Sequence, residues 1–304
     1  MAATTELTMN EMAPFKTLII HELFMGLLQV QIMLRLITYT REYGWIAAYV
    51  LVFTIFCALI SCGIKSLSPR TNRFRLLWNI VVMNFAFTSI RYVVPALGSR
   101  IRDDLLVAID KLLIGGDLSI MAQQLYSKPL TELMSLGYML FIVFLIFSFF
   151  YYGITAELFK LRAFCVGLFT LYAFGITGYT IIPAQGPLVY LADYLTVPVE
   201  GYFFTWLNEA MVKAGSAGYD VFPSLHVGVG LYLLLFFSRF DRGIWRAYLI
   251  PFVLLVISTI YLRYHYCIDL ICGMLLSLAC FHLSPGFALN RQVETNQTVT
   301  EKFS

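Results

Sequence analysis

The sequence carries little charge and lacks the features that mark several common classes of protein. Of its 304 residues only 13% are charged, whereas 60% are hydrophobic, a balance outside the usual range for a soluble globular domain. The net charge of +3 comes without a basic tract interleaved with aromatic residues, which excludes nucleic acid as a partner. The first residues, MAATTELTMNEMAPFK, lack the basic start and short apolar core of a cleaved signal peptide, so we expect none.

Cysteine pairs at close spacing are also lacking. The six cysteines show no Cys-x-x-Cys spacing and all fall within apolar segments: Cys57, Cys62, Cys165, Cys267, Cys272 and Cys280. We interpret them as small core residues and not as disulfides or zinc ligands. The sequence implies neither a metal nor a cofactor.

Long apolar segments dominate what is present. A helix needs about 20 mostly apolar residues to cross a bilayer, and the suitable segments are 44–64, 76–97, 130–153, 161–182, 223–239, 243–263 and 265–284. An eighth segment, 17–38, contains charged and amide side chains, so it either spans the membrane or lies along the interface. The sequence therefore predicts an all-α, polytopic membrane helix bundle of seven or eight spans.

The positions of the cations predict the orientation of this bundle. Lys and Arg concentrate in the short linkers 65–75, 154–162 and 238–246, which alternate spans place on one side. By the positive-inside rule that side is cytoplasmic. The long connectors, 98–129 and 183–222, then lie on the extracytoplasmic or lumenal side.

The first long connector contains an acidic stretch at 101–119. Its apolar residues recur at helical spacing, which predicts an amphipathic helix on the outer membrane surface. Its carboxylates are alternative candidates for binding a substrate: Asp104, Asp110 and Asp117.

Ionisable residues gather at two places where spans meet the extracytoplasmic side. The second connector re-enters the membrane at PSLH, 223–226, and the segment ISTIYLRYHYCIDLICG, 257–273, contains Arg263, His265 and Asp269. A charged side chain within a span costs about 2.5–3.5 kcal/mol on insertion scales, so such groups face a cavity and each other. An imidazole and a carboxylate four residues apart share one helix face.

These residue types suit the chemistry of a phosphate ester. Asp269 would fix one ring nitrogen of His265 and leave the other free as a nucleophile or general base. His226 would donate a proton to a leaving oxygen. A helix that starts at Pro223 and Ser224 favours an anion, and the Ser224 hydroxyl adds a donor. Because the site opens from the membrane, we expect a lipid phosphoester substrate.

The two motifs also resemble those of a known family. Pro-Ser-x-His followed by a Ser-initiated His-x-x-x-Asp, here PSLH and STIYLRYHYCID, is similar to the type 2 phosphatidic acid phosphatase superfamily of lipid phosphatases and phosphotransferases. The resemblance implies a six-helix core in which His265 attacks phosphorus to give a phosphohistidine. It implies that Asp269 orients this histidine and that His226 protonates the leaving group.

The resemblance also suggests how the chain is organised. Residues 1–75 form an N-terminal segment with one or two additional spans, and residues 76–285 form the catalytic core. Residues 286–304 form a polar tail that we expect to be disordered.

The sequence departs from the phosphatase pattern where phosphate-binding cations are expected. The stretch at 175–187 has no cation, and Ser258-Thr259 replaces Ser-Arg. Since a transferring phosphate needs its charge neutralised, Arg263 and Arg91 are the substitute candidates, although Arg91 at the end of a span is equally suited to reaching the lipid headgroups. These departures resemble the inositolphosphotransferase branch, which is similar to inositol phosphorylceramide synthase and uses a lipid alcohol as acceptor.

Three alternatives remain open at this point. One is a lipid phosphate phosphatase that uses water as acceptor. Another is a proton- or ion-coupled transporter that uses the His-Asp pair, although no internal repeat or broken span supports it. The third is a metal site formed by His226, His265 and Asp269.

Overall fold

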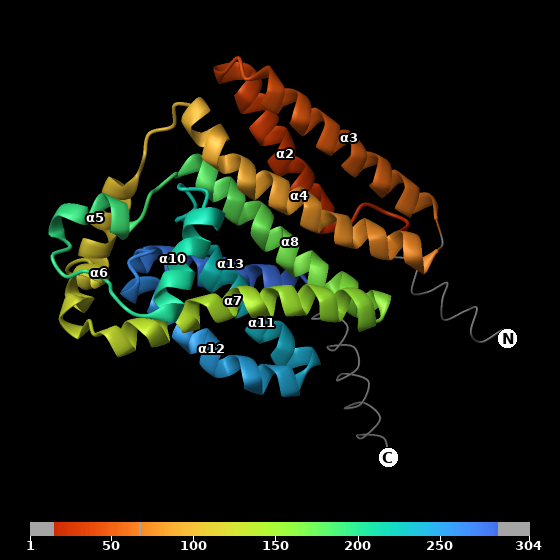
Figure 1. Cartoon of the computed structure of the whole chain (residues 1–304). Helices are drawn as coiled ribbons and strands as arrows, with labels where there is room; N and C mark the ends of the chain where they lie inside the picture. The colour runs from red at the N-terminus through yellow and green to blue at the C-terminus, as the bar shows by residue number, and fades with distance from the viewer. Residues whose placement is uncertain (1–14, 67, 285–304) are drawn as a thin grey trace.

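The computed structural model describes residues 15–66 and 68–284, and this part of the chain is helical, without a β-strand. A single isolated β-bridge joins Ala184 and Asp220. The longer helices of the bundle (Figure 1) are α2 (Ile20–Tyr39), α3 (Tyr43–Lys65), α4 (Pro69–Ala96), α7 (Lys128–Thr155), α8 (Leu158–Ile181), α11 (Leu225–Phe240), α12 (Arg242–Tyr261) and α13 (Cys267–Leu283).

Shorter helices occupy the two long connectors. The first connector forms α5 (Asp103–Ile114), α6 (Leu118–Met121) and the 3₁₀ helix η2 (Ala122–Leu125), and the second forms α9 (Pro187–Tyr190), η3 (Ala192–Tyr194) and α10 (Phe203–Gly215). In Figure 1, α5, α6 and α10 lie at the same end of the bundle. The helix predicted within 101–119 is thus present as α5.

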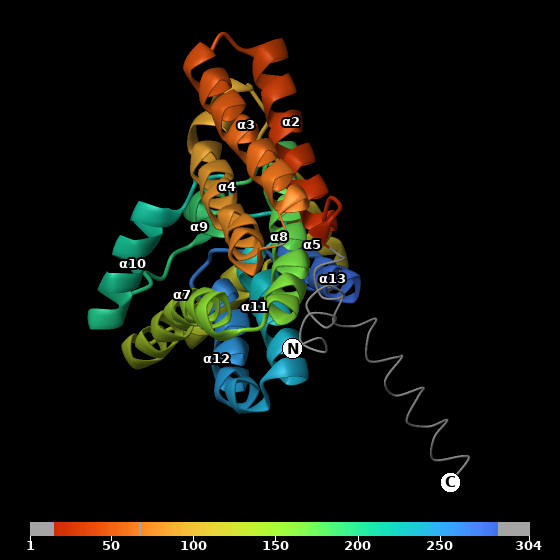
Figure 2. The ribbon, with the colours of Figure 1, turned by 90° about the vertical axis from the view of Figure 1, so that its right-hand side faces the viewer.

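The prediction of an all-α, polytopic membrane bundle is confirmed. Within the described residues, six helices are long and apolar enough to cross a membrane, and α11 and α13 are shorter apolar helices. The doubtful segment 17–38 is one of the six, as α2, and it packs along α3, α4 and α8; Figure 2 shows α2 beside α3. The prediction for the tail at 286–304 lies outside the described residues.

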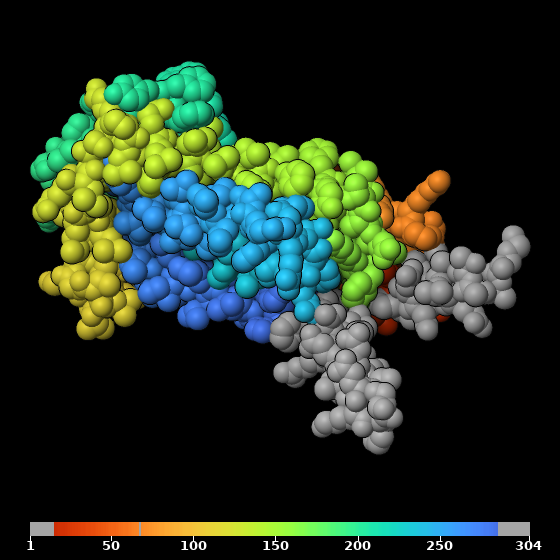
Figure 3. Space-filling view, turned by 90° about the horizontal axis from the view of Figure 1, so that it is seen from below, coloured from red at the N-terminus to blue at the C-terminus, as the bar shows by residue number. Residues whose placement is uncertain are grey.

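Burial separates the central helix from those that face lipid. In α8, 78% of the most apolar stretch is buried inside the protein, compared with 22% in α3 and in α12. Helix α8 contacts α2, α4, α11 and α13, and α7 and α12 pack side by side along the face seen in Figure 3. A helix that is apolar all round and buried is expected in the core of a bundle.

A buried ion pair ties the N-terminal helix to the bundle. Arg75 of α4 lies 2.6 Å from Glu22 of α2, and both side chains are almost fully buried. The same guanidinium donates to the backbone oxygens of Phe15 and Thr17. Helix α4 begins at Pro69 and not at 76, so this part of the predicted linker is helical, and Arg73 in it donates to the backbone oxygens of Gly153 and Ala156.

Two glycines allow α11 and α13 to touch through their backbones. A Cβ atom on Gly273 would lie 2.3 Å from the backbone oxygen of Ser224, and one on Gly228 would lie 2.9 Å from the oxygen of Gly273. At this crossing the backbone N–H of Ser224 donates to the oxygen of Asp269 at 3.0 Å. The crossing therefore brings the Pro-Ser-Leu-His and His-x-x-x-Asp motifs together.

Two acidic residues of α5 form hydrogen bonds with the start of α13, next to this crossing. Asp110 accepts hydrogen bonds from the backbone N–H groups of Cys267 and Ile268, at 2.7 and 2.9 Å, in the first turn of α13. Asp103, which the sequence did not single out, accepts from the Tyr266 hydroxyl at 2.8 Å. The bonds to Asp110 satisfy N–H groups that a helix start leaves free.

The other two acidic candidates of the first connector have local partners. Asp117 caps α6 by accepting from the N–H of Ser119 at 2.8 Å, and Asp104 is exposed and pairs with Arg100 at 2.7 Å. Asp104, Asp110 and Asp117 do not line the cavity described below. The structure therefore gives these carboxylates structural contacts and not a place in the site.

Candidate active site

Two histidines from different helices meet at the end of the bundle that carries the long connectors. His226 is the second residue of α11, and His265 lies in the turn between α12 and α13. Nδ1 of His226 lies 3.3 Å from Nε2 of His265. Both side chains line a cavity of about 570 Å³ with mainly apolar and aromatic walls, a volume within the usual range for small-molecule sites.

Asp269 lies behind His265 and is fully buried. Its Oδ2 is 3.5 Å from Nδ1 of His265 and accepts a hydrogen bond from the N–H of Tyr266 at 2.9 Å. The sequence suggested that His265 and Asp269 share a helix face, but α13 begins at Cys267 because the Asp269 carboxylate caps the helix start. The distance of 3.5 Å is long for a hydrogen bond, so the interaction between the two side chains is mainly electrostatic.

Tyr138 of α7 is a site residue that the sequence did not reveal. Its hydroxyl lies 2.9 Å from Nε2 of His226. This contact engages Nε2 and leaves Nδ1 as the ring nitrogen that faces His265. Tyr138 precedes His226 by 88 residues and belongs to no motif, so no local pattern could have identified it.

Arg263 lies in the break between α12 and α13. Such a break is needed if Arg263 and His265 are to reach the same phosphate. Its backbone has a positive φ of 65°, and its side chain lines the same cavity as the histidines. The guanidinium donates to the Tyr126 hydroxyl at 2.9 Å and to the oxygen of Val197, and it stacks over the Tyr126 ring at 4.7 Å. Both partners are neutral oxygens, which leave the positive charge of Arg263 uncompensated.

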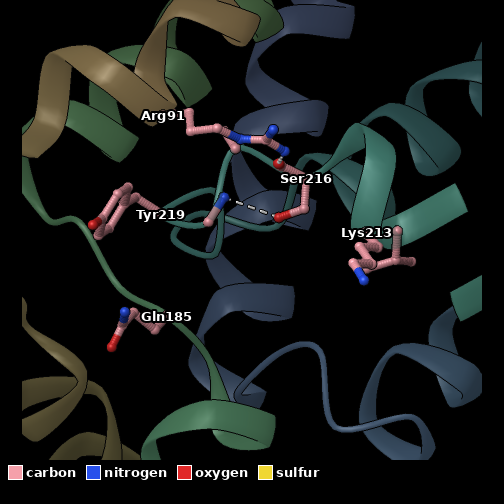
Figure 4. A pocket seen from close by; sticks show the side chains of 8 residues that line it. Arg91, Gln185, Lys213, Ser216 and Tyr219 are labelled. Atoms are coloured by element: carbon pink, nitrogen blue, oxygen red, sulfur yellow. Dashed lines mark hydrogen bonds between the residues drawn. The ribbon is translucent and has the colours of Figure 1, made fainter. Parts of the chain in front are cut away.

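Arg91 and Ser224 are not brought to the histidines in the way that the sequence suggested. Arg91 donates to the backbone oxygen of Ser216 and, together with Lys213, lines a hollow of about 410 Å³ that adjoins the cavity of the histidines and shares part of its lining, including Ser216. Figure 4 shows the Arg91 guanidinium beside Ser216 and Lys213 on another wall. Ser224 is fully buried and caps α11 by accepting from the N–H of Val227 at 3.4 Å. It does not line the cavity.

Asp220 is the second site residue that the sequence analysis missed. It is nearly buried and lines the cavity together with both histidines. The Ser216 hydroxyl donates to its Oδ1 at 2.7 Å. A signal was present, because Asp220 is the acidic residue that immediately precedes the re-entry of the chain at Pro223.

Burial keeps His265 in the form that a nucleophile needs. Removal from water lowers the pKa of His265 from the ordinary 6.5 to about 4, although the negative charge of Asp220 opposes this change. The imidazole is therefore neutral near pH 7, and one ring nitrogen retains its lone pair.

The three residues weighed as a metal site lack the required arrangement. Between residues 15 and 284, leaving out 67, no group of three His, Cys, Asp or Glu side chains is placed to hold a metal ion.

The fold and the site define a polytopic membrane protein with two histidines and a carboxylate around an apolar cavity. A family model of the type 2 phosphatidic acid phosphatase (PAP2) superfamily matches residues 104–283, more than half of the chain. The chain belongs to the PAP2 superfamily, whose members are phosphatases and phosphotransferases of lipid phosphoesters. The match begins in α5 and includes the whole site, whereas α2, α3 and α4 precede it.

Comparisons with curated proteins and with solved structures gave no significant match.

Proposed function

We propose that the protein is a lipid phosphotransferase that moves a phosphorylated headgroup to a lipid alcohol through a phosphohistidine on His265. The observation that carries this proposal is the approach of Nε2 of His265 to Nδ1 of His226, 3.3 Å apart in one cavity. A nucleophile and a proton donor must lie this close to the same leaving group.

The first half of the reaction forms the covalent intermediate. Nε2 of His265 attacks phosphorus, and the bond between phosphorus and the oxygen of the departing lipid breaks. His226, protonated on both ring nitrogens when the anionic substrate is bound, gives its Nδ1 proton to that oxygen and becomes neutral. Asp269, beside Nδ1 of His265, stabilises the positive charge that develops on the ring, and Arg263 stabilises the charge on the phosphoryl oxygens.

The second half transfers the group to the acceptor. His226 takes the proton of the acceptor hydroxyl while its oxygen attacks phosphorus, and the bond to His265 breaks. The mainly apolar walls of the cavity favour a lipid alcohol over water, because they offer water few hydrogen-bond partners. The short supply of cations in the cavity also favours a singly charged phosphodiester over a doubly charged phosphomonoester.

We further propose that the site faces the extracytoplasmic or lumenal side. The cations Arg75, Lys160 and Arg242 lie near the ends of α4, α8 and α12 that are remote from the site. The positive-inside rule assigns that end to the cytoplasm.

The test is product analysis with purified protein. Wild-type protein is incubated with mixed phospholipids, with and without lipid alcohols, and the products are read by mass spectrometry. We expect a new phospholipid only when the alcohol is present. His265→Ala and Asp269→Ala should lower turnover by a factor of roughly 10³ or more, because nucleophilic and electrostatic contributions of this kind are that large.

Two matched variants control for general damage. His282→Ala and Asp104→Asn change the same residue types outside the cavity and should retain nearly wild-type turnover. Release of free phosphate without an alcohol would show a phosphatase instead. Near wild-type turnover by folded His265→Ala would refute the phosphohistidine.

A further inference from the structure

The charges that line the active-site cavity point to a property of the substrate. Among the described residues that line it, only Arg263 and Asp220 carry permanent charges. Neither takes part in an ion pair within the described part of the chain: the partners of Arg263 are a phenol, a ring face and a carbonyl, and the side-chain partner of Asp220 is the Ser216 hydroxyl. An acidic side chain in a membrane protein is costly unless it faces a partner.

Asp220 is poorly suited to a site that binds only a phosphate. A carboxylate near the phosphoryl group would repel it, yet Asp220 lines the same cavity as both histidines. The backbone bridge between Asp220 and Ala184 and the bond from Ser216 fix the carboxylate in this place. One positive and one negative charge in the cavity together match a substrate that carries both signs.

The surroundings of Asp220 suit an organic cation. Tyr138 and Tyr179 line the same cavity as Asp220, and the Tyr264 ring, which also lines it, contacts that of Tyr138 with centroids 4.9 Å apart. Aromatic faces attract ammonium groups and recognise alkylated ones in particular, because these have few or no N–H groups for a hydrogen-bonding site. A carboxylate beside aromatic rings therefore supplies both the charge and the apolar contact that an alkylammonium needs.

We propose that Asp220, Tyr138 and Tyr179 form a subsite for the ammonium group of a zwitterionic headgroup, so that the donor is a phosphodiester of the phosphocholine or phosphoethanolamine type. This inference rests on the proposed function, because it takes the phosphoryl group to lie between Arg263 and the histidines. A headgroup without an ammonium, such as phosphoinositol, would leave Asp220 uncompensated.

Donor preference tests the subsite. Transfer by the wild-type protein is measured with dihexanoyl phosphatidylcholine, phosphatidylethanolamine, phosphatidylinositol and phosphatidic acid, with diacylglycerol and ceramide as acceptors. We expect kcat/KM to be at least about tenfold higher with the two zwitterionic donors, as one charge-assisted contact allows. A comparison of kcat/KM for the choline and ethanolamine donors distinguishes a subsite that binds mainly through aromatic rings from one that binds mainly through hydrogen bonds.

Substitutions at Asp220 separate charge recognition from general damage. Asp220→Asn should lower kcat/KM about tenfold or more for the zwitterionic donors and much less for phosphatidylinositol, whereas Asp220→Glu should restore most of the preference and Asp104→Asn should change nothing. An equal loss with every donor would show that Asp220 acts only on the histidines and would overturn the proposal. So would a wild-type preference for phosphatidylinositol or phosphatidic acid, a result that needs no folded variant.

A binding measurement distinguishes failure of the subsite from failure of the proposed function. Dodecylphosphocholine and dodecyl phosphate are titrated into His265→Ala protein, which cannot turn over, and into the same protein with Asp220→Asn added. The added substitution should weaken binding of dodecylphosphocholine about tenfold and not that of dodecyl phosphate. This result without wild-type turnover of any donor would refute the transferase and retain the subsite, whereas turnover without this difference would refute the subsite alone.

Discussion

A single hydroxyl group engages one ring nitrogen of His226 and leaves the other facing His265. Tyr138 lies 2.9 Å from Nε2 of that ring, and Nδ1 faces His265. When Nε2 keeps its proton and donates it to the Tyr138 oxygen, Nδ1 is the nitrogen that gives a proton to the leaving oxygen and takes one from the acceptor. Tyr138 is thus a positioning residue for the acid and not itself a proton donor to the substrate.

Tyr138→Phe tests this assignment. The ring remains, so packing against the Tyr264 ring is kept, while the orienting hydroxyl is lost. We expect kcat to fall roughly tenfold to a hundredfold with a smaller change in KM, since general acid catalysis contributes about 10² to 10⁴ in rate. The pH profile of kcat should also change shape, which a purely structural role would not cause. Unchanged kcat and pH profile would contradict the assignment.

At the scale of the helices, the crossing of α11 and α13 determines whether the two motifs meet. Gly228 and Gly273 leave no room for a side chain between the backbones, and the backbone bond from Ser224 to Asp269 lies at the same crossing. Helices that approach through glycines are common in membrane bundles, because close packing replaces the hydrophobic driving force there. The position of His226 relative to Asp269 therefore depends on having glycine, which has no β-carbon, at both of these positions.

Gly273→Ala should separate the two helices. The added methyl group would lie 2.3 Å from a backbone oxygen, and overpacking of this kind costs about 1–3 kcal/mol or more. We expect a lower melting temperature in detergent and at least about a tenfold loss of turnover, because a displacement near 1 Å can cost a hundredfold in rate. Gly243→Ala in α12 is the matched control, since nothing lies within 4 Å of its added carbon. Equal behaviour of the two variants would show that the crossing is not tight.

For the whole molecule, the distribution of cations predicts which membrane face carries the site. Single cysteines are introduced at Lys213 of α10 and at Arg242 of α12, both exposed, and sealed vesicles of known orientation are treated with a membrane-impermeant maleimide. We expect Lys213→Cys to react from the extracytoplasmic or lumenal side and Arg242→Cys only after permeabilisation. Wild-type protein controls for Cys57 and Cys62, which are exposed on α3. The reverse pattern would place the site on the cytoplasmic face.

Much of this architecture could be predicted from the sequence because span length and composition are local properties. The proximity of the Pro-Ser-Leu-His and His-x-x-x-Asp motifs could also be predicted, because the ends of consecutive spans lie close together. Tyr138 and the actual location of Arg91 were not, because each depends on how segments far apart in the chain pack. The start of α13 after His265 could not be predicted either, because it depends on the capping contact of Asp269.

The ion pair between Arg75 and Glu22 affects how the protein is inserted into the membrane during its synthesis. Glu22 emerges 53 residues before the arginine that neutralises it, and an unpaired carboxylate in hydrocarbon is costly. We therefore expect α2 to be stably inserted in the bilayer only once α4 has been synthesised. Helices α2, α3 and α4 should then leave the translocation channel as one set, before the part of the chain that matches the superfamily, which starts at residue 104, has been made.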